Sequence, residues 1–154
     1  MARWLITGGA GFIGSHLVGE LVRKGESVRV LDDFSAGRRE NIAEVASKIS
    51  VVRGDVREKK DVKRALKNID YVLHQAAIRS VPRSLDDPIF TNDVNVGGTL
   101  MILWESLKAG ESVPRSPTGA LPKVSGWTGS DASIQLNFIP AVEVAPAVPA
   151  PPSV

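Results

Sequence analysis

The sequence is poor in several residue types, and each scarcity excludes a class of protein. Among its 154 residues there is no cysteine, which excludes a disulfide scaffold, a thiol nucleophile and a metal site built on thiolates. Its 19 basic and 17 acidic residues leave a net charge of +2, too small to indicate nucleic acid as a partner. Two isolated histidines do not make a metal site.

Long apolar runs are also missing. No segment reaches the roughly 20 apolar residues needed to cross a bilayer, so no membrane association is expected. The N-terminus does not resemble a signal peptide, because glycines interrupt the apolar stretch that follows Arg3. The sequence therefore predicts a cytoplasmic protein, and its length suits one domain of ordinary size.

Composition changes near Gly110. Eight of the 10 prolines lie in residues 111–154, where each removes a backbone donor and fixes φ. We expect this Pro-rich C-terminal tail to be mostly irregular, although Ser133–Phe138 alternates apolar and polar residues and could form a short strand. Residues 1–110 are expected to form the folded domain.

Residues 1–110 alternate between strand and helix patterns. Strands are predicted at Arg3–Thr7, Ser27–Leu31, Ile49–Val52 and Asp70–His74, and helices at Phe12–Lys24, Glu40–Lys48, Lys59–Leu66 and from about Asp87 to Ala109. Apolar strands that alternate with helices favour a parallel sheet covered on both faces. The expected fold class is α/β, a Rossmann-type doubly wound sheet that is incomplete, with about four strands.

A glycine-rich turn, Thr7–Gly14, joins the first strand to the first helix. Two spacings overlap, one starting at Gly8 and one at Gly9, and in both the first glycine allows a tight turn. Gly11 lets a pyrophosphate approach the backbone, and Gly14 lets the helix pack close to the strand. The helix N-terminus adds unpaired N–H groups and a positive dipole end. In this strand–turn–helix context the motif predicts dinucleotide binding.

An acid follows the second strand. Asp32 lies 18 residues after Gly14, where a carboxylate can accept from ribose hydroxyls and would repel a 2′-phosphate. This favours NAD over NADP, although Arg38 or Arg39 could reach such a phosphate. The alternative to dinucleotide binding is that the three glycines only form a turn and that Asp32 is a solvated surface residue.

Other candidates have two interpretations each. Asp55 could accept from the adenine amino group or could cap the next helix. The small residues of Gln75–Ala77 could make room for a ligand at the strand ends or could simply pack closely. His74, inside a predicted strand, is expected to be a hydrogen-bonded core histidine, and the basic face at Lys59–Lys67 a solvated surface.

Seven blocks of the first 110 residues carry a family resemblance. They are Thr7–Leu17 (TGGAGFIGSHL), Leu31–Asn41 (LDDFSAGRREN), Gly54–Val56 (GDV), Val72–Ala77 (VLHQAA), Ser80–Ser84 (SVPRS), Asp87–Pro88 and Asn95–Thr99 (NVGGT). Together they resemble the extended short-chain dehydrogenases/reductases, and within them the NAD-dependent nucleotide-sugar epimerases and dehydratases. The SVPRS block is most similar to UDP-sugar 4-epimerases.

The resemblance implies NAD as cofactor and assigns roles by position. Backbone of Phe12 and Ile13 would contact the pyrophosphate, and Asp55 and Val56 would hold the adenine. The adenosine ribose would be surrounded by Asp32, Asp33, Phe34, Ser35, Ala36 and Gly37. The path to the nicotinamide ribose would be lined by Gln75, Ala76, Ala77 and Arg79, with Asn95 fixing that loop. The sugar would lie near Ser80, Val81 and Arg83.

The catalytic pair of that family is absent. Its enzymes use a Tyr and, four residues later, a Lys, whereas the single tyrosine here, Tyr71, is followed at that distance by Gln75. We therefore expect no catalytic residue, and interpret the chain as a truncated or frameshifted gene product carrying the NAD-binding part and an unrelated tail.

The partners follow from the same interpretation. A UDP-sugar would be a substrate only of a complete homologue, and the apolar stripe of the 88–109 helix, which includes Trp104, could form a homodimer. A stand-alone NAD-binding or interaction module, or a fragment of a related dehydratase or decarboxylase, is the alternative. A third interpretation is that the chain folds poorly, because the fourth strand would be an uncovered edge of the sheet.

Overall fold

The computed structural model describes residues 1–110. The predicted tail, with the strand alternative at Ser133–Phe138, lies outside the described residues. Within residues 1–110 no helix is long and apolar enough to cross a membrane.

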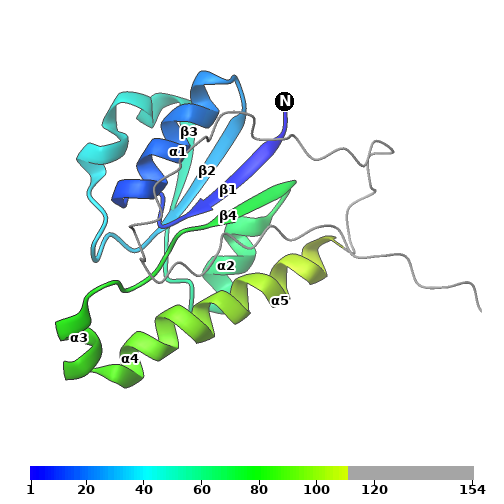
Figure 1. The fold of residues 1–154 in the computed structure, drawn as a ribbon. Coiled ribbons are helices and arrows are strands. Elements are labelled where there is room, and N and C mark those ends of the chain that lie inside the picture. Colours follow the sequence, from blue (N-terminus) through cyan, green and yellow to red (C-terminus); the bar gives the residue numbers. More distant parts are fainter. Residues whose placement is uncertain (111–154) are drawn as a thin grey trace, which may run out of the picture.

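Four parallel strands form one sheet in the order β3-β2-β1-β4 (Figure 1). Their bounds are β1 Arg3–Thr7, β2 Ser27–Asp32, β3 Ile49–Arg53 and β4 Tyr71–His74. The central strands are apolar on both faces: Leu5, Ile6, Val30 and Leu31 are fully buried. This confirms the predicted parallel α/β fold, in which helices must cover both sides of the sheet.

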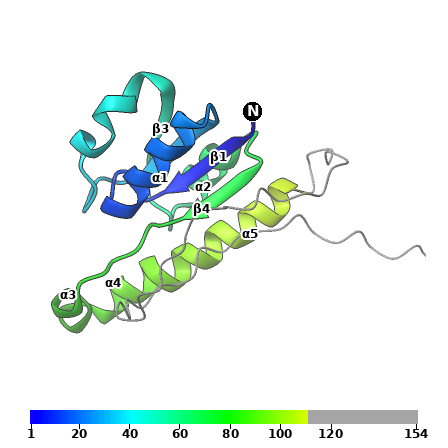
Figure 2. The same ribbon diagram turned by 45° about the horizontal axis from the view of Figure 1, so that its top comes forward.

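Helices lie on both faces of the sheet (Figures 1 and 2). On one face, α1 (Phe12–Arg23) and the 3₁₀ segment η1 (Arg39–Lys48) pack together. On the other, α2 (Lys59–Leu66) packs against α5 (Thr99–Gly110). Val62, Ala65 and Leu66 of α2 are buried. The two faces of the sheet have separate apolar clusters.

The segment after β4 differs from the prediction. A short helix, α3 (Val81–Asp86), precedes α4 (Pro88–Asn92), and the single helix expected from Asp87 contains a π-helical stretch, η2 (Asp93–Gly98), before α5. No residue of α3 is buried, so the sequence carries no apolar periodicity there. The predicted start of this helix near Asp87 is correct: the Asp87 side chain caps α4 by accepting from Phe90 N at 2.9 Å.

All four strands end on the same side, because they are parallel and joined by crossovers. Their carboxyl ends, the turn before α1 and the helices α3 and α4 therefore gather at one end of the sheet (Figure 1). Ligands of doubly wound sheets bind at this end.

Candidate functional site

The turn between β1 and α1 is built so that only glycine fits at two positions. Gly8 has φ +65°, and a Cβ there would lie 2.7 Å from the backbone nitrogen of Ala76. A Cβ on Gly14 would lie 2.1 Å from the Gly8 carbonyl oxygen. These contacts hold the start of α1 against the end of β1, which is the close approach that the sequence predicts.

The N-terminus of α1 faces the space beyond this turn. Gly11 is the N-cap residue and offers no side-chain cap, so the first N–H groups of the helix have no partner within it. Gly11, Phe12 and Ile13 all border one cavity. Unpaired amides, the helix dipole and the missing Cβ of Gly11 together make a cradle suited to a pyrophosphate.

The carboxylate of Asp32 fastens this turn to the end of β2. Its Oδ2 accepts from Ala10 N and its Oδ1 from Phe34 N, both at 2.8 Å, and the residue is only 7% exposed. Because a carboxylate has about four acceptor sites, about two remain to accept from a ligand in the cavity. The structure therefore gives Asp32 an organising role that the sequence did not indicate.

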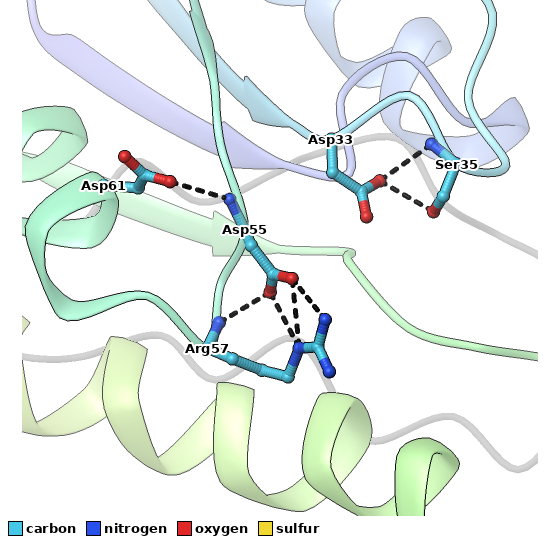
Figure 3. Close-up of polar contacts among 5 residues, drawn as sticks. All are labelled: Asp33, Ser35, Asp55, Arg57 and Asp61. Atoms are coloured by element: carbon cyan, nitrogen blue, oxygen red, sulfur yellow. Dashed lines mark hydrogen bonds and ion pairs between the residues drawn. The ribbon is translucent and has the colours of Figure 1, made fainter. Parts of the chain in front are cut away.

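Asp33 and Ser35 form the rim beside it (Figure 3). The Asp33 Oδ1 accepts from Ser35 N at 2.9 Å and from Ser35 Oγ at 2.7 Å. Phe34, between them, has a φ of 61° in the left-handed region. Its ring packs against the core under Arg39 and does not line the cavity.

Asp55 is engaged by its neighbour Arg57 (Figure 3). Its carboxylate accepts from the backbone N–H and the guanidinium of Arg57, and this pairing holds the pKa of Asp55 below its usual range. The capping alternative is wrong, because the N-cap of α2 is Glu58. Asp55 also borders the cavity.

At the end of β4, a hydroxyl and an imidazole hold the backbone in place. Thr7 Oγ1 lies 2.6 Å from His74 Nδ1 and accepts from Gln75 N at 3.1 Å and Ala76 N at 3.2 Å. His74 Nε2 lies 3.0 Å from Thr99 Oγ1. His74 is thus the hydrogen-bonded core histidine expected from the sequence, and burial lowers its pKa to about 4.

The loop after β4 is clamped by Asn95. Its Oδ1 accepts from Ile78 N at 2.7 Å and its Nδ2 donates to Ile78 O at 2.8 Å. The contact implied by the resemblance, Asn95 fixing this loop, is present. Ser80 and Val81 border the cavity below the loop, whereas Arg83 does not.

These parts surround one cavity of about 610 Å³, within the usual range for a small-molecule site. Its lining includes every predicted cofactor and sugar residue except Phe34 and Arg83. The sequence missed Gly54, His74, Ile78, Ser84, Phe90, Thr91 and Val94. Thr91 lies in α4 and Val94 in η2. No local sequence pattern could indicate that these segments come close to the strand ends.

Tyr71 stands apart from the cavity. Its ring stacks on Trp4 with centroids 4.6 Å apart, at the first residue of β4, while the cavity lies at the strand's other end. In the described part of the chain no tyrosine therefore faces the cavity, and no group of three or more potential metal ligands is found.

Comparison with known proteins agrees with this architecture. The family model described as GDP-mannose 4,6 dehydratase matches residues 5–114. The UDP-glucose 4-epimerase of Mycolicibacterium smegmatis is 43% identical over 112 residues, 70% of this chain and 36% of that protein. The UDP-N-acetyl-alpha-D-glucosaminuronate decarboxylase of Bacillus cytotoxicus is 37% identical over 72% of this chain and 35% of its own length.

A solved structure shows the same arrangement. The UDP-glucose 4-epimerase of Thermus thermophilus in complex with NAD superposes with a TM-score of 0.64 and 43% identity, covering 70% of this chain and 34% of that one. The chain thus spans about a third of the length of the curated relatives it matches.

The resemblance to nucleotide-sugar epimerases and dehydratases that the sequence motifs carry is confirmed by these matches. With a family model covering most of the described fold and a glycine turn of the expected geometry, the chain belongs to the GDP-mannose 4,6 dehydratase family.

Proposed function

We propose that this chain is the NAD-binding part of a nucleotide-sugar epimerase, dehydratase or decarboxylase. The observation that carries the proposal is the single cavity joining the glycine turn to the ends of the strands. Adenine would lie at Asp55 and Val56, its ribose at Asp32 and Asp33, and the pyrophosphate over the amides of Phe12 and Ile13. The nicotinamide half would run toward Gln75–Arg79 and Asn95.

The charges at the ribose favour NAD over NADP. Asp32 and Asp33 both border the cavity, so a 2′-phosphate would meet two carboxylates. Arg39 is held over the Phe34 ring, 4.6 Å from its centroid, and neither Arg38 nor Arg39 lines the cavity. The two arginines therefore offer little compensation to a bound phosphate.

The chain by itself is proposed to bind the cofactor without converting a sugar. Bound NAD supplies a hydride acceptor and donor, but sugar oxidation also needs a base to take the hydroxyl proton. Tyr71 stacks on Trp4 and is followed four positions later by Gln75, so it does not supply that base. Ser80 and Val81 mark where a sugar nucleotide would approach in a complete homologue.

Isothermal titration calorimetry of the whole chain with NAD and NADP tests this proposal. We expect micromolar NAD binding, weaker NADP binding, and loss of both in Gly11→Val, whose side chain would enter the pyrophosphate cradle. Gly19→Val, on α1 where a Cβ meets nothing within 4 Å, is the matched control. Absence of NAD binding by the folded chain, or turnover of UDP-galactose by it, would contradict the proposal.

Self-association along α5 is a second proposal. Leu100 and Trp104 are 64% and 52% exposed, and Leu107 continues the same stripe. Beside it a shallow apolar hollow is lined by Gly97, Leu100, Met101 and Trp104. A helix with a ridge and a hollow can pair with a second copy of itself about a two-fold axis.

Sedimentation equilibrium measures that pairing. The wild-type chain should reach dimer mass at micromolar concentration, and Trp104→Glu should remain monomeric. Lys63→Glu, an exposed charge change on α2, should leave the dimer intact. A wild-type chain that stays monomeric at every concentration would remove the proposal.

A further inference from the structure

The Asp55 carboxylate has a defined number of acceptor sites left. Arg57 contacts it through three N–H groups: the backbone N–H reaches Oδ1 at 2.8 Å and Nη2–H reaches Oδ2 at 2.5 Å. Nε–H is shared between Oδ1 at 3.1 Å and Oδ2 at 3.0 Å. Each carboxylate oxygen therefore has two contacts, and three donors on about four acceptor sites leave capacity for about one further hydrogen bond.

Arg57 is itself held in place. Its guanidinium lies over the Phe90 ring of α4, 4.7 Å from the ring centroid, a favourable cation–π arrangement. The pKa of Arg57 is raised by the hydrogen bond to Asp55, and further by the charges of Asp55, Asp93 and Asp33. A planar guanidinium fixed on one side by a ring and on another by a carboxylate fixes the plane of that carboxylate.

The Asp55 carboxylate lies at the cavity, whereas the Arg57 guanidinium lies behind it. Asp55 and Phe90 border the cavity, and Arg57 does not; Figure 3 shows the Arg57 side chain turned back onto Asp55. Arg57 therefore holds the carboxylate at the cavity in one orientation, with capacity to accept about one further hydrogen bond from a ligand.

We infer that Arg57 is a specificity-determining residue for the base of the dinucleotide, which it selects by orienting the Asp55 carboxylate toward an exocyclic amino group. This inference rests on the proposed NAD binding. Adenine offers an amino N–H at this position, whereas hypoxanthine offers a carbonyl oxygen. A fixed carboxylate accepts from the amino group and repels the carbonyl oxygen, and it is held so that it does not move across to the neighbouring N1–H that hypoxanthine also carries.

Calorimetric titration of the whole chain with NAD and with nicotinamide hypoxanthine dinucleotide tests the inference. The wild-type chain should bind NAD about 10-fold to 100-fold more tightly, the range expected of one hydrogen bond to a charged group. In Arg57→Met, which keeps an apolar chain over Phe90, the ratio should fall to about 3-fold or less. The loss should come from NAD, with affinity for the hypoxanthine dinucleotide little changed.

Two further variants keep the test decisive. Arg23→Met is the matched control. It removes a similar two-pronged arginine–carboxylate pair, since Arg23 Nε and Nη2 bind Glu20 at 2.9 and 2.8 Å on the exposed face of α1. It should leave the ratio of the two dinucleotide affinities unchanged. Asp55→Asn introduces an amide N–H that can donate to the carbonyl oxygen of hypoxanthine. It should therefore shift the binding preference toward the hypoxanthine dinucleotide.

The outcomes separate the inference from the function on which it rests. Equal wild-type affinity for both dinucleotides, or an Arg57→Met variant that weakens both by the same factor, overturns the role of Arg57 while NAD binding stands. A folded wild-type chain that binds neither dinucleotide overturns both.

Discussion

The Thr7 hydroxyl oxygen lies 2.6 Å from His74 Nδ1, joining the ends of β1 and β4 inside the sheet. Because this oxygen also accepts from Gln75 N and Ala76 N, its own proton is directed to Nδ1. His74 is then neutral and carries its proton on Nε2, which donates to Thr99 Oγ1. Thr99 in turn donates to the Asn95 carbonyl at 2.6 Å.

Removing the Thr7 hydroxyl should destabilise the fold. Thr7→Val keeps the buried shape but leaves His74 Nδ1 and the Ala76 N–H without a partner, and we expect a loss of about 2–3 kcal/mol in the free energy of unfolding. Urea denaturation followed by circular dichroism measures this. Thr7→Ser, which keeps the hydroxyl, should lose clearly less; a Thr7→Val variant as stable as the wild-type protein, or less destabilised than Thr7→Ser, would contradict this role of the hydroxyl.

Burial of His74 predicts a pH dependence of stability. Its pKa falls from 6.5 to about 4 because burial penalises the charged ring. A group whose folded-state pKa is lowered resists protonation, so stability is fully present above pH 6.5 and declines as the pH falls toward 4. The decline should amount to about 3 kcal/mol, measured by urea denaturation at several pH values.

A variant without the ring separates His74 from the carboxylates. His74→Gln should be less stable at pH 7 but nearly flat between pH 6.5 and 5. Asp55 and Asp70, whose pKa values are lowered by hydrogen bonds from Arg57 and Arg3, contribute only as the pH falls below about 4. If His74→Gln declined in parallel with the wild-type chain over that window, the assignment to His74 would be wrong.

The contrast between Thr7 and the glycines shows what a sequence can reveal of this site. The strand–turn–helix motif at Gly8–Gly14 has fixed spacing along the chain, so its place in the fold was predictable. The bond from Thr7 to His74 joins residues 67 apart, and a threonine at the end of an apolar strand carries no local sign of such a partner.

Gly14 and Gly19 lie on the same helix and predict opposite responses to a methyl group. A Cβ on Gly14 would lie 2.1 Å from Gly8 O, which is backbone and cannot move aside, whereas Gly19 has nothing within 4 Å. Gly14→Ala should cost at least about 2 kcal/mol of unfolding free energy. Gly19→Ala should gain about 0.5–1 kcal/mol through helix propensity.

Thermal and urea unfolding of both variants measure these differences. A Gly14→Ala chain as stable as the wild-type protein would show that α1 does not pack against the turn as the structure has it. The Gly19 variant also guards against a general intolerance of α1 to substitution.

Other features were predictable only in part. Ser80 and Pro82 are the cap and first-turn residues of α3, a start signal that was readable, but the helix buries nothing and so shows no period. The π-helical stretch at Asp93–Gly98 is invisible to a pattern that assumes 3.6 residues per turn. Within it Gly98 approaches Val56, where a Cβ would meet Cγ2 at 2.6 Å.

Asn95, in that π-helical stretch, gives the last prediction. Its amide bonds both backbone groups of Ile78, so Asn95→Ala leaves an N–H and a carbonyl of the cavity wall without partners. We expect a loss of about 1–2 kcal/mol in unfolding free energy. Relative to the wild-type chain, hydrogen exchange should speed up more at the Ile78 amide than at the β1 amides. Asn92→Ala, an exposed change in α4, should affect neither. If the Ile78 amide stayed protected in Asn95→Ala, the loop would be held by its other contacts, and Asn95 would not be what shapes this wall of the cavity.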